Sequence, residues 1–212
     1  MAKNGIIENL LALPVELCAG VPKPARRRRA AALCCGVLAV AVGVGAAELL
    51  MASGEPLRDL AVRLVLSCVL AGVLEEVLFR GGAFPLLIGV FADGRHPYLR
   101  AALVQAAIFA LLHLSGTVPA GMTVIVLVQA LAKVVQAMAF GLIMAAVYGL
   151  TRNLAVPVVA HIAYDLLSLF PRELFLGPTA TYLTGSAADA VVASVTAVAL
   201  AAIAILAWRA LR

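Results

Sequence analysis

Residues 74–82 read Leu74-Glu75-Glu76-Val77-Leu78-Phe79-Arg80-Gly81-Gly82, which places two adjacent carboxylates and an arginine within a long apolar run. In a membrane helix each ionised side chain costs about 2.5–3.5 kcal/mol on insertion scales. Glu75, Glu76 and Arg80 are therefore too costly to face lipid. We expect them to face a polar cavity inside a helix bundle, and such a cavity within a membrane indicates a function.

The composition of the whole chain indicates an integral membrane protein. Of its 212 residues, 64% are hydrophobic and only 13% are charged, and the mean hydropathy is +1.08. Soluble domains are about 45–50% apolar and about a quarter charged, so this chain has too little polar surface to cover a soluble core. Its apolar runs are long and do not alternate, which argues against a β-barrel. The sequence predicts an all-α membrane protein.

Six apolar runs predict a bundle of about six transmembrane helices within residues 30–212. A membrane helix must cross about 30 Å of hydrocarbon, and the runs were compared with that length. The runs are residues 30–52, 60–91, 101–114, 122–150, 154–170 and 190–208. Gly81, Gly82 and Pro85 are expected to break or kink the second run near its end. Pro171 is expected to end the fifth run, so that residues 172–189 form the longest polar loop.

Residues 1–29 are predicted to form an N-terminal unit at the membrane surface. Residues 5–18 are weakly amphipathic and predict a short interfacial helix, which Pro14 interrupts. The basic run that ends at Arg29 predicts a cytoplasmic anchor. A signal anchor fits better than a cleaved signal peptide, because the basic run comes late and the apolar stretch behind it is long.

The positive-inside rule supports six crossings with both chain ends in the cytoplasm. If the cluster Arg26 to Arg29 lies inside, alternation also brings most other basic residues inside: Lys23, Arg95, Arg100, Arg152, Arg209 and Arg212. Of the basic residues between the apolar runs, only Arg58 and Arg172 fall outside, both near acids. Because the basic residues flank apolar runs, the net charge of +5 indicates membrane lipids as partners and no nucleic acid. The predicted location is the cell membrane, with a multi-pass topology.

Three predicted helices carry ionisable or aromatic side chains at a spacing of four, so that each pair shares a helix face: Glu76 and Arg80, Phe109 and His113, His161 and Asp165. A carboxylate and imidazoles in a dry cavity can activate water and stabilise an oxyanion. The sequence contains no Gly-Xaa-Ser-Xaa-Gly, His-Glu-Xaa-Xaa-His or Walker-type motif. Water-mediated hydrolysis is therefore the reaction class that these residues allow.

Straight helices would not bring these residues to one depth. With a rise of 1.5 Å per residue, His161 lies about 10 Å and Glu75 about 24 Å from the predicted cytoplasmic helix ends. A kink between Gly81 and Pro85 would reduce this difference in depth between Glu75 and His161.

Three motifs in the same order resemble those of the CaaX protease and bacteriocin-processing (CPBP, or Abi) family of intramembrane endopeptidases, whose relatives include type II prenyl-protein endopeptidases. Glu-Glu-Xaa-Xaa-Xaa-Arg stands at Glu75–Arg80, Phe-Xaa-Xaa-Xaa-His at Phe109–His113, and His-Xaa-Xaa-Xaa-Asn/Asp at His161–Asp165. The resemblance covers residues 60–170, a CPBP-like core within the predicted bundle.

This resemblance implies a role for each motif residue. Glu75 would activate water together with His113, while Glu76 and Arg80 would orient and support the site, with Phe109 packing beside it. His161 and Asp165 would stabilise the oxyanion or hold a metal. The resemblance allows a metal-free mechanism and equally a zinc ion held by Glu75, His113 and His161.

The predicted function is an intramembrane endopeptidase that acts on a peptide or lipidated-peptide substrate. Prenylated CaaX tails, peptide pheromones, bacteriocin leaders and membrane protein segments all remain open as substrates. The alternative is a catalytically silent scaffold or bacteriocin-immunity protein, and the full set of motif residues favours the enzyme. A small transporter is disfavoured, because no convincing internal repeat is present. Lys133 and Gln136 either line the substrate path or lie on a tilted helix from which Lys133 snorkels.

Overall fold

A computed structural model of the chain describes residues 24–52, 56, 60–114, 123–176 and 182–212. The elements in this part are all helical, which confirms the all-α prediction. They are α2 (Pro24–Met51), α3 (Ala61–Glu76), the π-helix η2 (Val77–Ala83), α4 (Phe84–Val90), α5 (Pro97–Leu112), α6 (Val124–Thr151), α7 (Ala155–Ser168), α8 (Phe170–Leu176) and α9 (Ala187–Leu211).

Three described helices are long and apolar enough to cross a membrane, namely α2, α6 and α9. Helices α5 and α7 are apolar but shorter. The predicted second crossing is helical from Ala61 to Val90 and is divided into α3, η2 and α4. Each predicted crossing thus corresponds to helical structure, while the number of six crossings stays a prediction.

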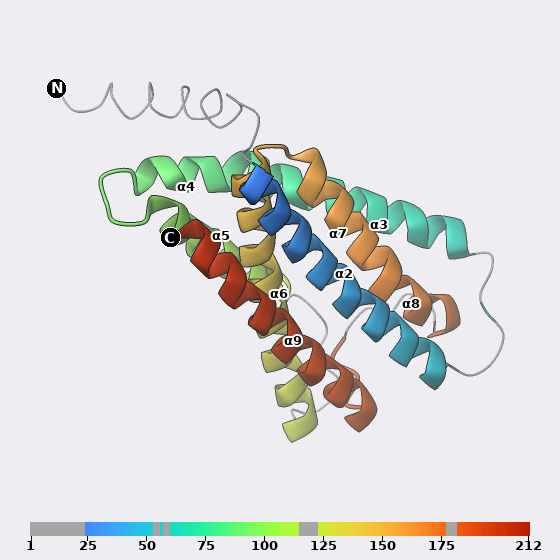
Figure 1. Cartoon of the computed structure of the whole chain (residues 1–212). Helices are drawn as coiled ribbons and strands as arrows, with labels where there is room; N and C mark the ends of the chain where they lie inside the picture. Colours follow the sequence, from blue (N-terminus) through green and yellow to red (C-terminus); the bar gives the residue numbers. More distant parts are fainter. Residues whose placement is uncertain (1–23, 53–55, 57–59, 115–122, 177–181) are drawn as a thin grey trace.

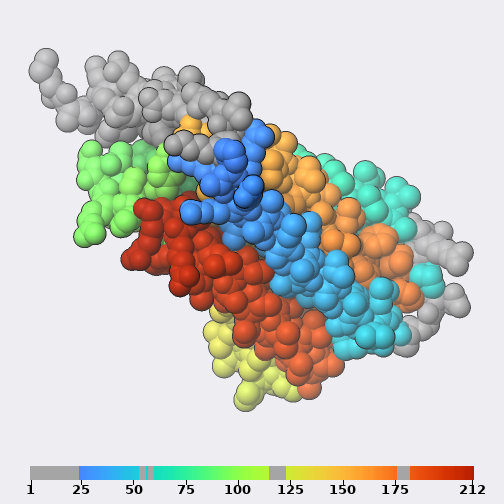
Figure 2. Space-filling model, viewed as in Figure 1, coloured from blue at the N-terminus to red at the C-terminus, as the bar shows by residue number. Residues whose placement is uncertain are grey.

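Helix α6 lies at the centre of the bundle, where α2, α5, α7 and α9 all contact it (Figure 1). Every residue from Ala139 to Tyr148 is buried, as expected for a helix with neighbours on all sides. Helix α2 packs against both α7 and α9, and α7 also packs against α3. Figure 2 shows α2 and α9 side by side over much of one face of the molecule.

Small residues let α7 approach its neighbours closely, as is typical of membrane helix interfaces. A Cβ atom at Gly72 of α3 would lie 2.7 Å from Cγ1 and 3.1 Å from the backbone nitrogen of Ile162. A Cβ atom at Gly45 of α2 would overlap the carbonyl oxygen of Leu167. The two glycines therefore hold α7 between α3 and α2, and α7 carries His161 and Asp165.

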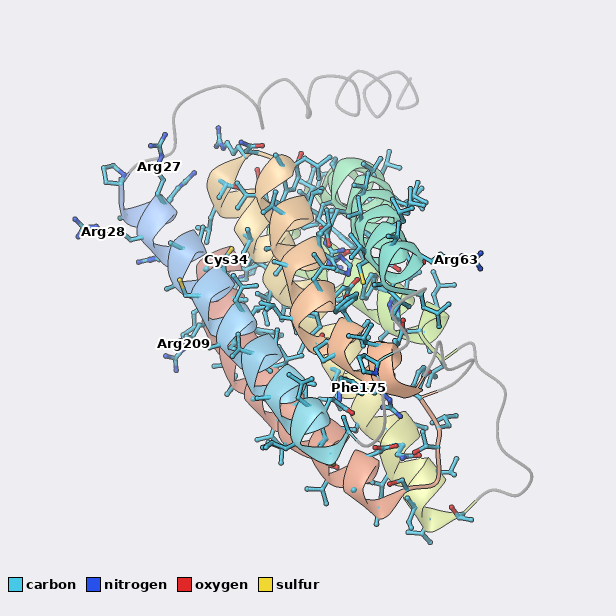
Figure 3. The ribbon with its side chains drawn as sticks, turned by 90° about the vertical axis from the view of Figure 1, so that its right-hand side faces the viewer. Arg27, Arg28, Cys34, Arg63, Phe175 and Arg209 are labelled. Carbon is cyan, nitrogen blue, oxygen red and sulfur yellow. The ribbon has the colours of Figure 1, made fainter. Side chains whose placement is uncertain are left out.

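The helix ends that the predicted topology assigns to one side do lie at one side of the bundle. They are the start of α2, the α4–α5 connection, the α6–α7 turn and the C-terminus (Figure 1). His96 Nδ1, in the α4–α5 connection, lies 3.0 Å from the carbonyl oxygen of Arg212. Arg63 of α3 is a further basic residue, and it points away from the bundle, far from Arg27 and Arg28 (Figure 3). The orientation of this bundle in a membrane stays a prediction.

The structure corrects the prediction for the segment after α7. Pro171 does not begin a long loop, because it lies in the first turn of α8, where a missing N–H leaves no intrahelical hydrogen bond unmade. Helix α9 begins at Ala187, and the Ser186 side chain caps it by accepting a hydrogen bond from Asp189 N–H. The predicted loop of residues 172–189 is therefore helical at both ends.

The predicted interfacial helix of residues 5–18 lies outside the described residues. Arg26 to Arg29 form the first turns of α2, so this part of the predicted basic anchor continues directly into the helix.

Candidate active site

The Glu75–Arg80 segment spans the change from α-helix to π-helix. Glu75 and Glu76 end α3, and Arg80 lies in η2, where Phe84 N–H donates to Phe79 O five residues earlier. Pro85 has no N–H to donate to Gly81, which removes one α-helical hydrogen bond at this point. The irregularity thus lies in the region where a break or kink was predicted, and π-helical turns occur frequently at functional sites.

Arg80 joins three helices beneath the site. Its side chain is completely buried, with Nη1 2.9 Å from Glu76 Oε1, so these two residues, which were expected to share a helix face, form an ion pair. Nη2 donates to the carbonyl oxygen of Gly141 in α6, which also accepts from Gln105 of α5. The guanidinium lies 5.1 Å from the centre of the Phe109 ring, within cation–π range. Arg80 therefore ties η2 to α5 and α6.

Glu76 orients His161 of α7. The carboxylate Oε1 lies 2.8 Å from His161 Nδ1 and accepts its hydrogen. The Phe140 ring packs edge-on against the imidazole, with 4.7 Å between ring centres. His161 Nε2 is therefore directed to the opposite side, where it lies 3.7 Å from Glu75 Oε2 and 3.7 Å from Asp165 Oδ2.

His113 lies at the C-terminal end of α5 and is held by main-chain contacts. Its Nδ1 donates to the Phe109 carbonyl oxygen at 2.8 Å, which leaves Nε2 as the acceptor of a neutral ring. The ring packs on Phe109 with 4.2 Å between centres, so Phe109 is a buried packing residue. The Tyr182 hydroxyl donates to the His113 carbonyl oxygen.

Glu75 Oε2 lies between the two imidazoles. It is 3.7 Å from Nε2 of His113 and 3.7 Å from Nε2 of His161. It is buried and has no hydrogen-bond partner among the described residues. Gaps of this length are too long for direct hydrogen bonds. A water molecule in this space would donate to the carboxylate and bridge it to the rings.

These groups line a cavity of about 260 Å³ between α2, α3, α5, α6, α7 and α9. Glu75, His113, His161 and Asp165 all face it, whereas Glu76 and Arg80 lie behind them as a buried support. Lys133 and Gln136 of α6 also line the cavity, so they face the interior of the bundle.

The donor atoms of Glu75, His113 and His161 suit zinc chemically, but their spacing is wider than zinc requires. Zn–N and Zn–O bonds of about 2.0–2.1 Å at tetrahedral angles put neighbouring donors about 3.3 Å apart. Glu75 Oε2 lies 3.7 Å from each Nε2. In the part of the chain that the structure describes, no three His, Cys, Asp or Glu side chains form a group that could hold a metal ion. The donors as placed therefore do not fit tetrahedral zinc.

Two side chains of the site escaped prediction. Gln105 is a lone amide in an apolar helix, and it precedes Phe109 by the same spacing of four that separates Phe109 from His113, so a signal was present. Tyr182 lies in a connection between helices, and no pattern in the sequence marks its contact with His113.

Residues 57–167 match the sequence model of a protein family described as type II CAAX prenyl endopeptidase Rce1-like. The matched segment contains Glu75, Glu76, Arg80, Phe109, His113, Lys133, His161 and Asp165. The chain belongs to the Rce1-like family. This membership confirms the predicted resemblance and indicates, at the family level, a CAAX-protease-like endopeptidase of a membrane. No curated protein matches the chain, and no solved structure does.

Proposed function

We propose that this Rce1-like protein is an intramembrane endopeptidase in which Glu75 activates the attacking water. The observation that carries the proposal is the position of Glu75 Oε2, 3.7 Å from each of two imidazole nitrogens and without a hydrogen-bond partner among the described residues. A water in this space donates one hydrogen to Glu75 and the other to His113 Nε2, which leaves an oxygen lone pair for attack.

In the proposed reaction, Glu75 first accepts a proton from the water and later returns it to the leaving group. The water oxygen forms a bond to the carbonyl carbon of the scissile peptide as Glu75 takes a proton. The carbonyl oxygen becomes the oxyanion of a tetrahedral intermediate. When the C–N bond breaks, Glu75 returns the proton to the departing amine, and a carboxylic acid and an amine are released.

His161 is the proposed oxyanion donor. Three carboxylates surround it, with Glu76 at 2.8 Å from Nδ1 and Glu75 and Asp165 at 3.7 Å from Nε2. Nearby negative charge favours the doubly protonated ring. Such an imidazolium donates from Nδ1 to Glu76 and offers its Nε2–H to the oxyanion. Asp165 helps to maintain this positive charge, so it needs no proton of its own.

The test compares purified wild-type protein with Glu75→Gln on a library of lipidated and unlipidated peptides, with products identified by mass spectrometry. General-base catalysis contributes about 100- to 10,000-fold, and Glu75→Gln is expected to lose at least the lower figure with an unchanged unfolding temperature. Cleavage by the wild type is expected to survive a strong chelator. Loss of cleavage on chelation with recovery on zinc addition would replace the proposed mechanism by a metal-dependent one. A well-folded wild type that cleaves no peptide would favour a non-catalytic scaffold.

A further inference from the structure

A second cavity, here called the outer groove, runs between α5, α6 and α9. Its volume is about 510 Å³, and it shares no described lining residue with the active-site cavity. The described side chains that line it are all apolar or aromatic, and they include Leu103 of α5, Met138 and Leu142 of α6, and Ala201, Ile205 and Trp208 of α9. Ile205 and Trp208 are exposed on the surface of the bundle. In a membrane, the outer groove therefore faces lipid.

Two arginines of α9 lie at one end of the outer groove. Arg209 follows the groove residue Ile205 by four, and Arg212 likewise follows Trp208. Residues four apart share one face of a helix, so each arginine lies one turn beyond a groove residue. Both arginines are exposed, and Arg209 points away from the helices (Figure 3). Among the described residues, no carboxylate lies within ion-pair distance of either arginine.

The start of α5 adds to the positive charge at this end. His96 Nδ1 lies 3.0 Å from the Arg212 carbonyl oxygen, which holds the start of α5 against the end of α9. Arg100 lies in the first turn of α5, with its guanidinium 4.5 Å from the centre of the Phe91 ring. Asp93 is the only acidic side chain that the described residues bring to this side of the bundle. This side therefore has an excess of positive charge, and the predicted topology places it in the cytoplasm, where the leaflet contains anionic lipids.

The length of the outer groove with its basic end matches one leaflet of a bilayer. Ala201 and Arg212 are eleven residues apart, which corresponds to about 16 Å along a helix. The hydrocarbon core is about 30 Å thick, so this distance is about half of it. The shape and the charge together fit a ligand with an apolar chain and an anionic group at one end.

We propose that the outer groove binds one anionic phospholipid of the cytoplasmic leaflet, at a site that does not depend on the proposed reaction. An acyl chain packs in the apolar groove beside Trp208. The phosphate accepts hydrogen bonds from the guanidinium groups of Arg209 and Arg212, since arginine binds phosphate with two parallel donors. A free phosphate would leave the groove unused, and a lipid without net charge would leave the two arginines without an anionic partner.

The bound lipid lies behind the active site. Met138 and Leu142 of α6 line the outer groove, whereas Phe140 of the same turns lines the active-site cavity. Phe140 packs edge-on against His161, with 4.7 Å between ring centres. The acyl chain therefore packs against the turns of α6 that support His161.

Trp208 is the single tryptophan of the chain, so its fluorescence reports on this site alone. Bromine atoms on an acyl chain quench tryptophan fluorescence on contact. The full chain is reconstituted in phosphatidylcholine vesicles that contain increasing fractions of brominated phosphatidylglycerol or of brominated phosphatidylcholine. Quenching of the wild type is expected to show about 30-fold tighter binding of the anionic lipid, about fivefold for each of the two arginines.

Charge variants test the basic end. The double variant Arg209→Gln/Arg212→Gln is expected to bring the ratio of the two binding constants to about 1. The matched control is Arg27→Gln/Arg28→Gln, which removes two exposed positive charges from the start of α2 and is expected to keep the ratio of the wild type. A double variant of α9 that keeps the preference would refute the phosphate site.

A substitution that fills the groove tests the place of the acyl chain. Ala201→Phe is expected to reduce quenching by both lipids severalfold, because the added ring occupies the space of the chain. Ala202→Phe is the control, since Ala202 is exposed and does not line the outer groove. Equal quenching in the two variants would refute the acyl-chain site.

Two results on the wild type would also overturn the proposal. Equal quenching by the anionic lipid and by phosphatidylcholine would mean that the arginines select no headgroup. Protection of Trp208 from both lipids, increasing with the ratio of protein to lipid, would assign the groove to a second copy of the chain. Because fluorescence requires no cleavage, failure of the proposed endopeptidase function would leave this test unaffected.

Discussion

At the scale of single residues, Glu75 and Glu76 are neighbours in sequence with opposite surroundings. Glu75 is 30% exposed to the cavity and makes no hydrogen bond through Oε2, whereas Glu76 is completely buried between Arg80 and His161. Replacement of the glutamate by glutamine should therefore lower activity without loss of stability at Glu75, and should lower stability at Glu76. Glu75 takes part in the proposed reaction, whereas Glu76 supports the fold and orients His161.

Glu76→Gln is expected to destabilise the protein, because it leaves the buried charge of Arg80 without its partner. Breaking a buried ion pair costs about 3–5 kcal/mol, whereas replacing both members can be nearly neutral. Adding Arg80→Met to Glu76→Gln should therefore recover part of the loss in unfolding free energy, measured by denaturation in detergent. Glu75→Gln is the matched control and should unfold like the wild type. Additive losses from Glu76→Gln and Arg80→Met would contradict the pairing as a source of stability.

At the scale of helices, the contacts of Gly45 and Gly72 hold α7, which carries His161 and Asp165, against α2 and α3. A Cβ atom at Gly72 meets Ile162, the residue next to His161, at 2.7 Å, whereas nothing lies within 4 Å of a Cβ atom at Gly43 of α2. Gly72→Ala is expected to push α3 from α7 and to lower kcat by about 100-fold, the effect of a displacement of about 1 Å. Gly43→Ala should leave kcat unchanged and raise helix stability slightly. Equal kcat values for the two variants would mean that this contact does not position Glu75.

The helices themselves follow from the apolar runs, but their relative depths do not. The rise along straight helices separated His161 and Glu75 by about 14 Å in predicted depth, yet the structure places their side chains 3.7 Å apart. The sequence gives the position of a residue along its own helix. The tilt of one helix against another depends instead on contacts between helices, such as that of Gly72 with Ile162. Pro171 is a second feature that the sequence alone did not place correctly. A proline is compatible both with the end of one helix and with the first turn of the next, and Pro171 lies in the first turn of α8.

At the scale of the whole molecule, polar residues join the helices on the side of the bundle away from the start of α2 and the C-terminus (Figure 1). Arg172 of α8 lies 3.1 Å from Asp189 of α9 and 3.7 Å from Glu48 of α2. Thr184 also donates to Asp189, and Gln129 of α6 donates to Thr184. These contacts join four helices where Glu48 lines the cavity. Charged groups therefore border the cavity at this end, where Glu48 is one of its lining residues.

The predicted topology places this polar end outside the cell and the chain ends in the cytoplasm, and cysteine labelling can test it. The start of α2, which contains Arg26 to Arg29, lies at the same side of the bundle as the α6–α7 turn and the C-terminus, and the positive-inside rule assigns this side to the cytoplasm. In a variant without the four native cysteines, a membrane-impermeant thiol reagent should label Ala188→Cys in intact cells. It should label Asn153→Cys only after permeabilisation; both positions are exposed on the described surface. The reverse pattern would place the chain ends outside, and labelling of both in intact cells would mean that no membrane separates them.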